Sequence, residues 1–107
     1  MRLVVIGAMG AGLSAALRAR RTDPSAEVVV LERGDVISYA ACGLPYYVEG
    51  RVASPGDLAV RTAEALERDG VRVRTRTAVA EIRHPRRELL LTGGERLAYD
   101  RLVVATG

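Results

Sequence analysis

The sequence predicts an α/β fold built around a parallel sheet, and three segments near the start of the chain support this prediction. Residues 2–6 form a short, mostly apolar and β-branched run that ends at Gly7, as a buried strand does. From about Gly12 to Thr22 apolar residues recur at helical spacing, and residues 27–31 form a second buried strand. Strand, glycine-rich turn, helix and strand within about 30 residues make a βαβ unit, which requires a parallel sheet and a right-handed crossover.

The middle of the chain is less regular. Residues 33–55 show no clear long-range period, and we place 38–47 on a loop that runs into a short helix. Residues 62–68 predict a further helix, because Thr62 can cap its start and Gly70 can end it.

The last third of the chain predicts strands with polar, solvent-facing sides. Apolar and arginine residues alternate over 71–76, and apolar segments follow at 79–83 and 88–92, separated by a turn at 84–86. We interpret these segments as an antiparallel meander with a solvated arginine face, followed by a last buried strand at 102–105.

Composition limits the class of protein. The 107 residues fit one compact domain, 49% of them are hydrophobic and 27% are charged, and the net charge is only +3. A single cysteine excludes an intrachain disulfide and favours a reducing compartment; no apolar run could serve as a signal or cross a bilayer. We therefore expect a cytoplasmic protein without a membrane partner. The arginines lack interleaved aromatic residues for base stacking, so we expect no nucleic-acid partner.

The glycine-rich turn Gly7-Ala8-Met9-Gly10-Ala11-Gly12 follows the first strand. Dinucleotide-binding folds use glycine where the strand turns, where the backbone nears the pyrophosphate, and where the helix meets the strand. Gly7 and Gly12 fit the first and third positions, Met9 occupies the second, and Gly10 can restore some closeness. The helix N-terminus would then face a diphosphate, although the turn alone is equally consistent with a plain strand-to-helix connection.

Glu32 strengthens the nucleotide interpretation. It ends the second strand, twenty residues after Gly12, where a dinucleotide-binding fold carries the acid that holds the ribose. A carboxylate there accepts hydrogen bonds from both ribose hydroxyls and repels a 2′-phosphate. The two features together predict FAD or NAD as the ligand, and not NADP.

Cys42 is the second candidate centre. It precedes Gly43-Leu44-Pro45 in a plausible turn into a helix, where the helix N-terminus stabilises a thiolate that can attack a disulfide or a peroxide. With no second cysteine, it would cycle through a mixed disulfide with a small thiol or through a sulfenic acid. The competing interpretation is a small buried apolar residue, which most lone cysteines are.

Two weaker candidates involve positive charge. Ser14, Arg18 and Arg21 share one face of the first helix, which suits an anionic ligand or simply solvent. His84, the only histidine, precedes a proline in a turn, and we expect it to be surface with no metal partner.

These motifs resemble a known family. The chain is similar throughout to the FAD-binding part of pyridine nucleotide-disulfide oxidoreductases, and most of all to the coenzyme A-disulfide reductase and NADH oxidase/peroxidase branch. The resemblance is carried by the glycine turn, Glu32-Arg33, the segment 38–47 around Cys42, the Arg61-Thr62 helix start, and Tyr99-Asp100 leading to Ala105-Thr106-Gly107. It implies a three-layer, Rossmann-type FAD-binding half-domain with an antiparallel β-meander.

The resemblance also implies particular site residues. FAD would lie along the glycine turn and the strand-end acid, with its flavin near the cysteine and the last residues, and with a main-chain contact to its adenine: Gly7, Gly12, Glu32, Arg33, Val79, Thr106 and Gly107. In coenzyme A-disulfide reductases the corresponding helix positions and one loop serine line the coenzyme A site: Ser14, Arg18, Arg21 and Ser38. Two positions depart from the family pattern, because Ala41 stands where family members often have asparagine and Met9 replaces the middle glycine.

Family members continue into an NAD-binding domain, a second FAD-binding stretch and a dimerisation domain. We therefore expect residues 1–107 to be one FAD-binding domain at the N-terminus of a longer, homodimeric enzyme. In that enzyme, electrons would pass from NAD(P)H through FAD to a disulfide between Cys42 and coenzyme A. The alternatives are an NADH oxidase or peroxidase that uses a Cys42 sulfenic acid on oxygen or peroxide, a nucleotide-binding module without turnover, and a simple NAD-binding domain.

Overall fold

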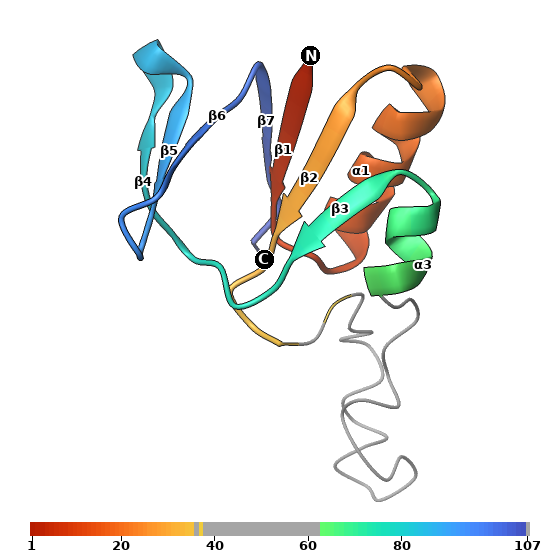
Figure 1. Ribbon diagram of the computed structural model, residues 1–107, viewed down its shortest axis with the longest axis horizontal. Helices are drawn as coiled ribbons and strands as arrows, with labels where there is room; N and C mark the ends of the chain where they lie inside the picture. Colours follow the sequence, from red (N-terminus) through yellow and green to blue (C-terminus); the bar gives the residue numbers. More distant parts are fainter. Residues whose placement is uncertain (36, 38–62, 107) are drawn as a thin grey trace, which may run out of the picture.

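The structure, a computed structural model, describes residues 1–35, 37 and 63–106 (Figure 1). Our expectations for 38–62, which include Ser38, Cys42 and the Thr62 cap, lie outside the described residues, as does Gly107. The described elements follow one another as β1 (Arg2–Ile6), α1 (Gly10–Thr22), β2 (Glu27–Leu31), α3 (Ala63–Arg68), β3 (Val71–Arg74), β4 (Val79–Arg83), the 3-10 turn η3 (His84–Arg86), β5 (Glu88–Leu91), β6 (Arg96–Ala98) and β7 (Arg101–Val104).

A parallel sheet in the order β3-β2-β1-β7 forms the middle layer. Helices α1 and α3 cover one face of it, and the antiparallel sheet β4-β5-β6 lies on the other side (Figure 1). The predicted βαβ unit is confirmed, since β1 and β2 pair in parallel on either side of the α1 crossover. The three-layer α/β class with an antiparallel meander is confirmed as well.

Two apolar cores explain the continuous hydrophobic runs of β1 and β2. Successive side chains of a strand point to opposite faces. Leu3 and Val5 therefore join the helix-side core with Leu13 and Leu66, whereas Val4 joins the meander-side core, which also contains Val29, Leu31, Leu89, Leu91 and Tyr99. A strand buried on both faces has no polar side to alternate with.

Our assignment of residues 71–74 to the meander was wrong. These residues form β3 and pair in parallel with β2 at the edge of the main sheet, with Val28 opposite Val71. Val71 is fully buried in the helix-side core, whereas Arg72 on the other face is exposed. An edge strand covered on one face shows the same period of two as a meander strand, so alternation did not distinguish them. The meander consists instead of β4, β5 and β6, the last of which the pattern did not predict.

The last strand is not as buried as predicted. β7 lies at the edge of the main sheet beside β1, and Val104 is 58% exposed. Among residues 1–35, 37 and 63–106, no helix has the length and apolarity that crossing a bilayer requires.

Several arginines of the predicted solvated face form ion pairs. Arg74 donates to both carboxylate oxygens of Glu95, at 2.8 Å each, and Arg83 lies 3.3 Å from Glu81. His84 is on the surface as expected, but its Nδ1 lies 3.2 Å from the hydroxyl of buried Tyr99. This bond links the η3 turn to the meander-side core.

Candidate functional site

The glycine turn begins at Gly7, where β1 ends. Its φ of +109° is in the region that favours glycine, and a Cβ there would lie 2.2 Å from the carbonyl oxygen of Ala105. The Gly7 N–H donates to the Leu31 carbonyl at 2.8 Å. Gly7 therefore lets the chain turn while it lies against the last residue of β2 and the first residue after β7.

Gly12 fills the third glycine role. A Cβ at Gly12 would lie 1.9 Å from the Gly7 carbonyl oxygen, so only glycine lets α1 pack this closely on the turn. Gly10 is different, because it is exposed and a Cβ there would have no neighbour within 4 Å. Gly10 therefore leaves open space beside the turn and takes no part in its packing.

The N-terminus of α1 has no capping side chain and no acidic residue of its own. Its N-cap, Met9, makes no side-chain hydrogen bond to the first turn, and that turn contains no acidic residue. The first N–H groups of a helix lack intrahelical acceptors, and together they amount to roughly half a positive charge. An anionic group such as a diphosphate fits this position.

The carboxylate of Glu32 lies over the same turn. One oxygen accepts the N–H of Ala8 at 3.0 Å, and the other accepts the N–H of Gly34 at 2.8 Å. Because an ionised carboxylate can accept about four hydrogen bonds, two positions remain for hydroxyl groups of a ligand. The side chain is thus fixed in direction while it keeps capacity to bind.

Main-chain hydrogen bonds join the loop after β2 to the segment after β3. The Glu32 N–H donates to Arg74 O at 2.9 Å, Thr77 donates to Glu32 O at 2.8 Å, and Arg76 donates to Gly34 O at 3.0 Å. The two segments therefore form adjacent walls that start from neighbouring strand ends.

A cavity of about 380 Å³ opens between these segments and the glycine turn. Its volume is in the range of small-molecule sites. The residues that line it are Ile6, Gly7, Leu31, Glu32, Arg33, Thr77, Ala78, Val79 and Thr106. They include five residues that we predicted to bind the cofactor: Gly7, Glu32, Arg33, Val79 and Thr106.

The other predicted residues lie elsewhere. Gly12 supports the turn from within α1. Ser14, Arg18 and Arg21 are exposed on α1 and line a separate depression of about 520 Å³ together with Ala15 and Leu17. Cys42, Ser38 and Gly107 lie outside the described residues. The described residues therefore do not connect the cavity beside the glycine turn with the depression on α1.

Sequence reasoning missed the residues that hold the site in shape. Ala8 and Gly34 contribute main-chain N–H groups, and Thr77 and Ala78 contribute one wall of the cavity. Any residue type except proline can donate a main-chain N–H, so such donors cannot be recognised in a sequence. The one available signal is Gly34, because a glycine two positions after Glu32 is typical of a turn. Among the described residues, no group of three His, Cys, Asp or Glu side chains could hold a metal ion.

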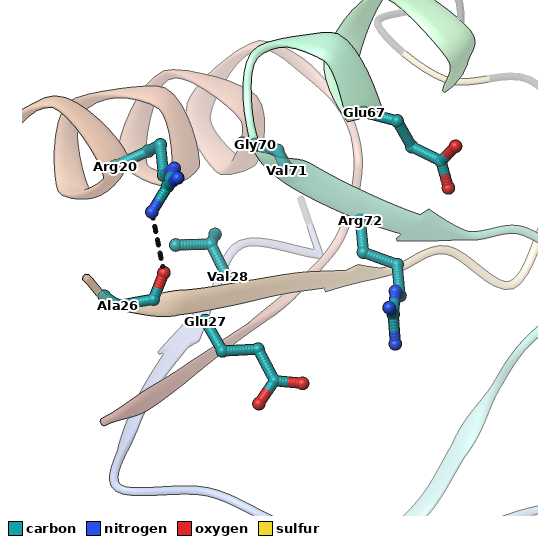
Figure 2. Close-up of a pocket in the computed structure, with 8 residues that line it drawn as sticks. All are labelled: Arg20, Ala26, Glu27, Val28, Glu67, Gly70, Val71 and Arg72. Carbon is teal, nitrogen blue, oxygen red and sulfur yellow. Dashed lines mark hydrogen bonds between the residues drawn. The ribbon is translucent and has the colours of Figure 1, made fainter. Parts of the chain in front are cut away.

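A second hollow, of about 400 Å³, lies at the opposite edge of the sheet, between the end of α1, the start of β2 and the end of α3 (Figure 2). Arg20 points across it, but its guanidinium already donates to the carbonyl of Ala26 at 3.1 Å and to that of Pro24. Glu67 and Arg72 point away from the hollow centre in Figure 2. Its polar side chains do not converge on a common point, and we assign it no ligand.

The parallel sheet, the glycine turn and the strand-end carboxylate define a class: a Rossmann-type α/β domain of the kind that binds dinucleotides. Comparison with known proteins identifies the family. All 107 residues match the family described as pyridine nucleotide-disulphide oxidoreductase, and the chain belongs to it, which confirms the resemblance in the sequence.

Individual relatives agree with this assignment. The chain is 38% identical over its full length to an NADH oxidase of Enterococcus faecalis, of which it covers 25%. It is 34% identical over 99% of its length to an NAD(P)H coenzyme A polysulfide/persulfide reductase of Pyrococcus horikoshii, of which it covers 24%. The structure of an NAD-dependent persulfide reductase from A. fulgidus matches the whole chain with a TM-score of 0.91 and 40% identity, over 21% of that protein. The chain thus spans about a quarter of the length of these relatives.

Proposed function

We propose that residues 1–107 form one FAD-binding domain and that the cavity beside the glycine turn takes the adenosine part of FAD. The observation that carries this proposal is the position of the Glu32 carboxylate, which lies over the glycine turn with acceptor capacity to spare. Two ribose hydroxyls are suitable donors for it. The diphosphate would lie at the N-terminus of α1, and Arg33, Val79 and Thr106 would line the bound cofactor.

The residues present fit this cofactor. A dinucleotide needs a turn without side chains, an N-terminal helix end free of acidic residues, and an acid for the ribose, and the chain supplies all three. When bound, FAD would supply the capacity to accept and pass on electrons, and the protein would supply binding and orientation.

For a longer parent enzyme, we propose transfer of electrons from NAD(P)H to a disulfide that includes coenzyme A, with Cys42 as the thiol that exchanges with it. Support comes from the family, from the coenzyme A polysulfide/persulfide reductase among the relatives, and from the basic face of α1. Ser14, Arg18 and Arg21 are exposed around one depression, and arginine forms paired hydrogen bonds to phosphate oxygens. Ser38 would complete this substrate site. We place the parent enzyme in the cytoplasm as a homodimer.

A second candidate is an NADH oxidase or peroxidase, in which Cys42 would cycle through a sulfenic acid. The relative that favours it is the NADH oxidase of Enterococcus faecalis. Mass spectrometry of Cys42 in the purified parent separates the two functions. A coenzyme A adduct supports the disulfide reductase, whereas the addition of one oxygen atom supports the oxidase.

The cofactor proposal is tested on the chain itself. Purified, folded chain should bind FAD saturably, as measured by quenching of flavin fluorescence, and Glu32→Gln should weaken that binding. A folded chain that binds no FAD would contradict the proposal. A chain that binds NAD in preference to FAD would identify a simple NAD-binding domain.

A further inference from the structure

We propose that Asp35 and Arg76 act as a clasp that holds two walls of the cavity in the position that receives the adenosine part of FAD. Both are positioning residues: they act through Glu32, Arg33 and Thr77 and do not line the cavity themselves. This inference rests on the proposed binding of FAD and adds to it a pair of side chains that the sequence did not single out.

The position of the pair in the fold is the first support. Asp35 lies three residues after Glu32 in the loop that follows β2, and Arg76 lies just before Thr77 in the segment that follows β3. The Nε of Arg76 donates to Oδ1 of Asp35. The loop that carries the proposed ribose-binding acid is thereby joined, side chain to side chain, to the adjacent wall.

The backbone at Arg76 is the second support. Arg76 has a φ of +51°, in the left-handed region that a bulky residue adopts at a cost. Such conformations persist where surrounding contacts hold them, and here the Arg76 N–H donates to Gly34 O while Thr77 donates to Glu32 O. Glycine would occupy this position without strain, so the arginine side chain gives the position something that glycine cannot: a charge opposite Asp35.

Charge adds a third support. The hydrogen bond from Arg76 to Asp35 raises the pKa of the Arg76 guanidinium above its usual range, so the guanidinium keeps its charge. Both side chains are well exposed, at 80% and 64%, and solvent therefore screens their attraction. The clasp should act as a modest, salt-sensitive adjustment of affinity.

The chain offers a matched control. Arg74 and Glu95 form a second ion pair, with two hydrogen bonds of 2.8 Å, that joins β3 to the turn between β5 and β6. Neither residue lines the cavity. A variant of Glu95 therefore removes a nearby ion pair without changing any residue that lines the cavity.

The test measures the FAD dissociation constant of the 107-residue chain and, in parallel, its urea unfolding midpoint. The variants are Asp35→Asn, Arg76→Gln, the charge exchange of Asp35→Arg with Arg76→Asp, and the control Glu95→Gln. Aspartate tolerates the left-handed backbone of position 76, so the exchange is sterically acceptable. Each measurement is made at low ionic strength and at about 1 M salt, where the screening length falls to roughly 3 Å.

We expect Asp35→Asn and Arg76→Gln each to raise the dissociation constant about two- to fivefold at low salt and to have no effect at high salt. The charge exchange should restore wild-type affinity, and Glu95→Gln should leave affinity unchanged. A lowered unfolding midpoint with unchanged affinity would identify a purely structural pair and overturn the clasp. So would an exchange that fails to restore binding.

The two proposals fail in different ways. Wild-type chain that is folded and binds no FAD overturns the proposed function, and the clasp with it. If the wild-type chain binds FAD and the variants at positions 35 and 76 bind it with the same dissociation constant, the clasp alone is overturned.

Discussion

The two ends of the parallel sheet carry hollows of similar size and opposite character. At the carboxyl end, the carboxylate residue Glu32 and the first glycine of the turn that leads into α1 line a space of about 380 Å³. At the amino end, near Gly70, the hollow of about 400 Å³ is lined by an arginine whose Nη1 already donates to two main-chain carbonyls (Figure 2). Size therefore does not distinguish a binding site from a gap between elements.

What distinguishes the two ends is the direction of the backbone. Parallel strands send all their carboxyl ends to one edge, where the loops and helix N-termini that follow present N–H donors. The opposite end collects strand starts and helix ends, and here Arg20 donates to two carbonyls of the loop between α1 and β2. The comparison predicts that changes at the carboxyl end alter ligand binding and that changes at the amino end alter stability alone.

The largest effect should come from Gly12→Ala. Its Cβ would lie 1.9 Å from the main-chain oxygen of Gly7, and backbone cannot swing aside as a flexible side chain can, so we expect destabilisation by about 3 kcal/mol. Gly10→Ala, two residues earlier in the same helix, is the control. A Cβ at Gly10 would have no neighbour within 4 Å, and alanine is the better helix former. The free energy of unfolding should therefore stay the same or rise by up to about 1 kcal/mol. Urea denaturation measures the unfolding free energy of both variants. Equal losses in the two variants would contradict the close approach of Gly12 to the Gly7 carbonyl.

Glu32→Gln should have the next largest effect. The amide retains one acceptor oxygen where the carboxylate has two, and it loses the charge, so FAD binding should weaken about tenfold or more. Glu27→Gln is the control, since Glu27 begins the same strand at the other end of the sheet and pairs with Arg2 at 3.0 Å. Fluorescence titration should show unchanged affinity for Glu27→Gln. If both variants bind FAD equally, the proposed site is wrong.

Gly70→Ala tests the amino end of the sheet, where we expect a change to alter stability alone. Gly70 has a φ of +87°, and an added Cβ would lie 2.2 Å from Nε of Arg20. We expect a loss of about 1–2 kcal/mol of unfolding free energy from the strained backbone, with FAD affinity unchanged. A variant that stays folded and binds FAD more weakly would show that the two ends are coupled.

The smallest effect concerns pH. The hydrogen bond from Arg74 holds the pKa of the Glu95 carboxyl below its ordinary value. A carboxyl with a lowered pKa binds fewer protons when folded than when unfolded, so its stabilising effect is present at neutral pH. That effect disappears as the pH falls through the ordinary glutamate pKa of about 4.3 and below. Glu95→Gln should therefore lose less stability than wild type between about pH 5 and pH 3 in urea titrations; parallel losses would contradict this.

Parts of the fold were predictable because burial leaves a direct mark on sequence. Residues 3–6 and 28–31 are all apolar because both faces of β1 and β2 are covered there, and the bounds of the two strands were predicted correctly. Helix α1 begins at Gly10, two residues before the predicted start, because Met9 gives no side-chain cap to mark it. The partner of residues 71–74 was not predictable, since alternation reports one covered face and not which sheet covers it.

The geometry of the candidate site was predictable where spacing fixes it, whereas the binding roles of its residues stay a prediction. Gly7, Gly12 and Glu32 were found because a turn, a close approach and a strand end each demand a residue type at a set interval. The ion pair of Asp35 with Arg76 joins residues 41 positions apart through two loops, and no periodic pattern connects them. The role of Cys42 remains a prediction from the sequence and the family.

The two hydrogen bonds that fix Glu32 have a thermodynamic consequence. A free glutamate side chain gives up about 1.5–2 kcal/mol of rotational freedom when it is immobilised. Because Ala8 and Gly34 already hold the carboxylate, that loss falls on folding and not on ligand capture. The proposed nucleotide site is therefore preorganised, and we expect any change that loosens the loop after β2 to weaken FAD binding even when every residue that lines the cavity is intact.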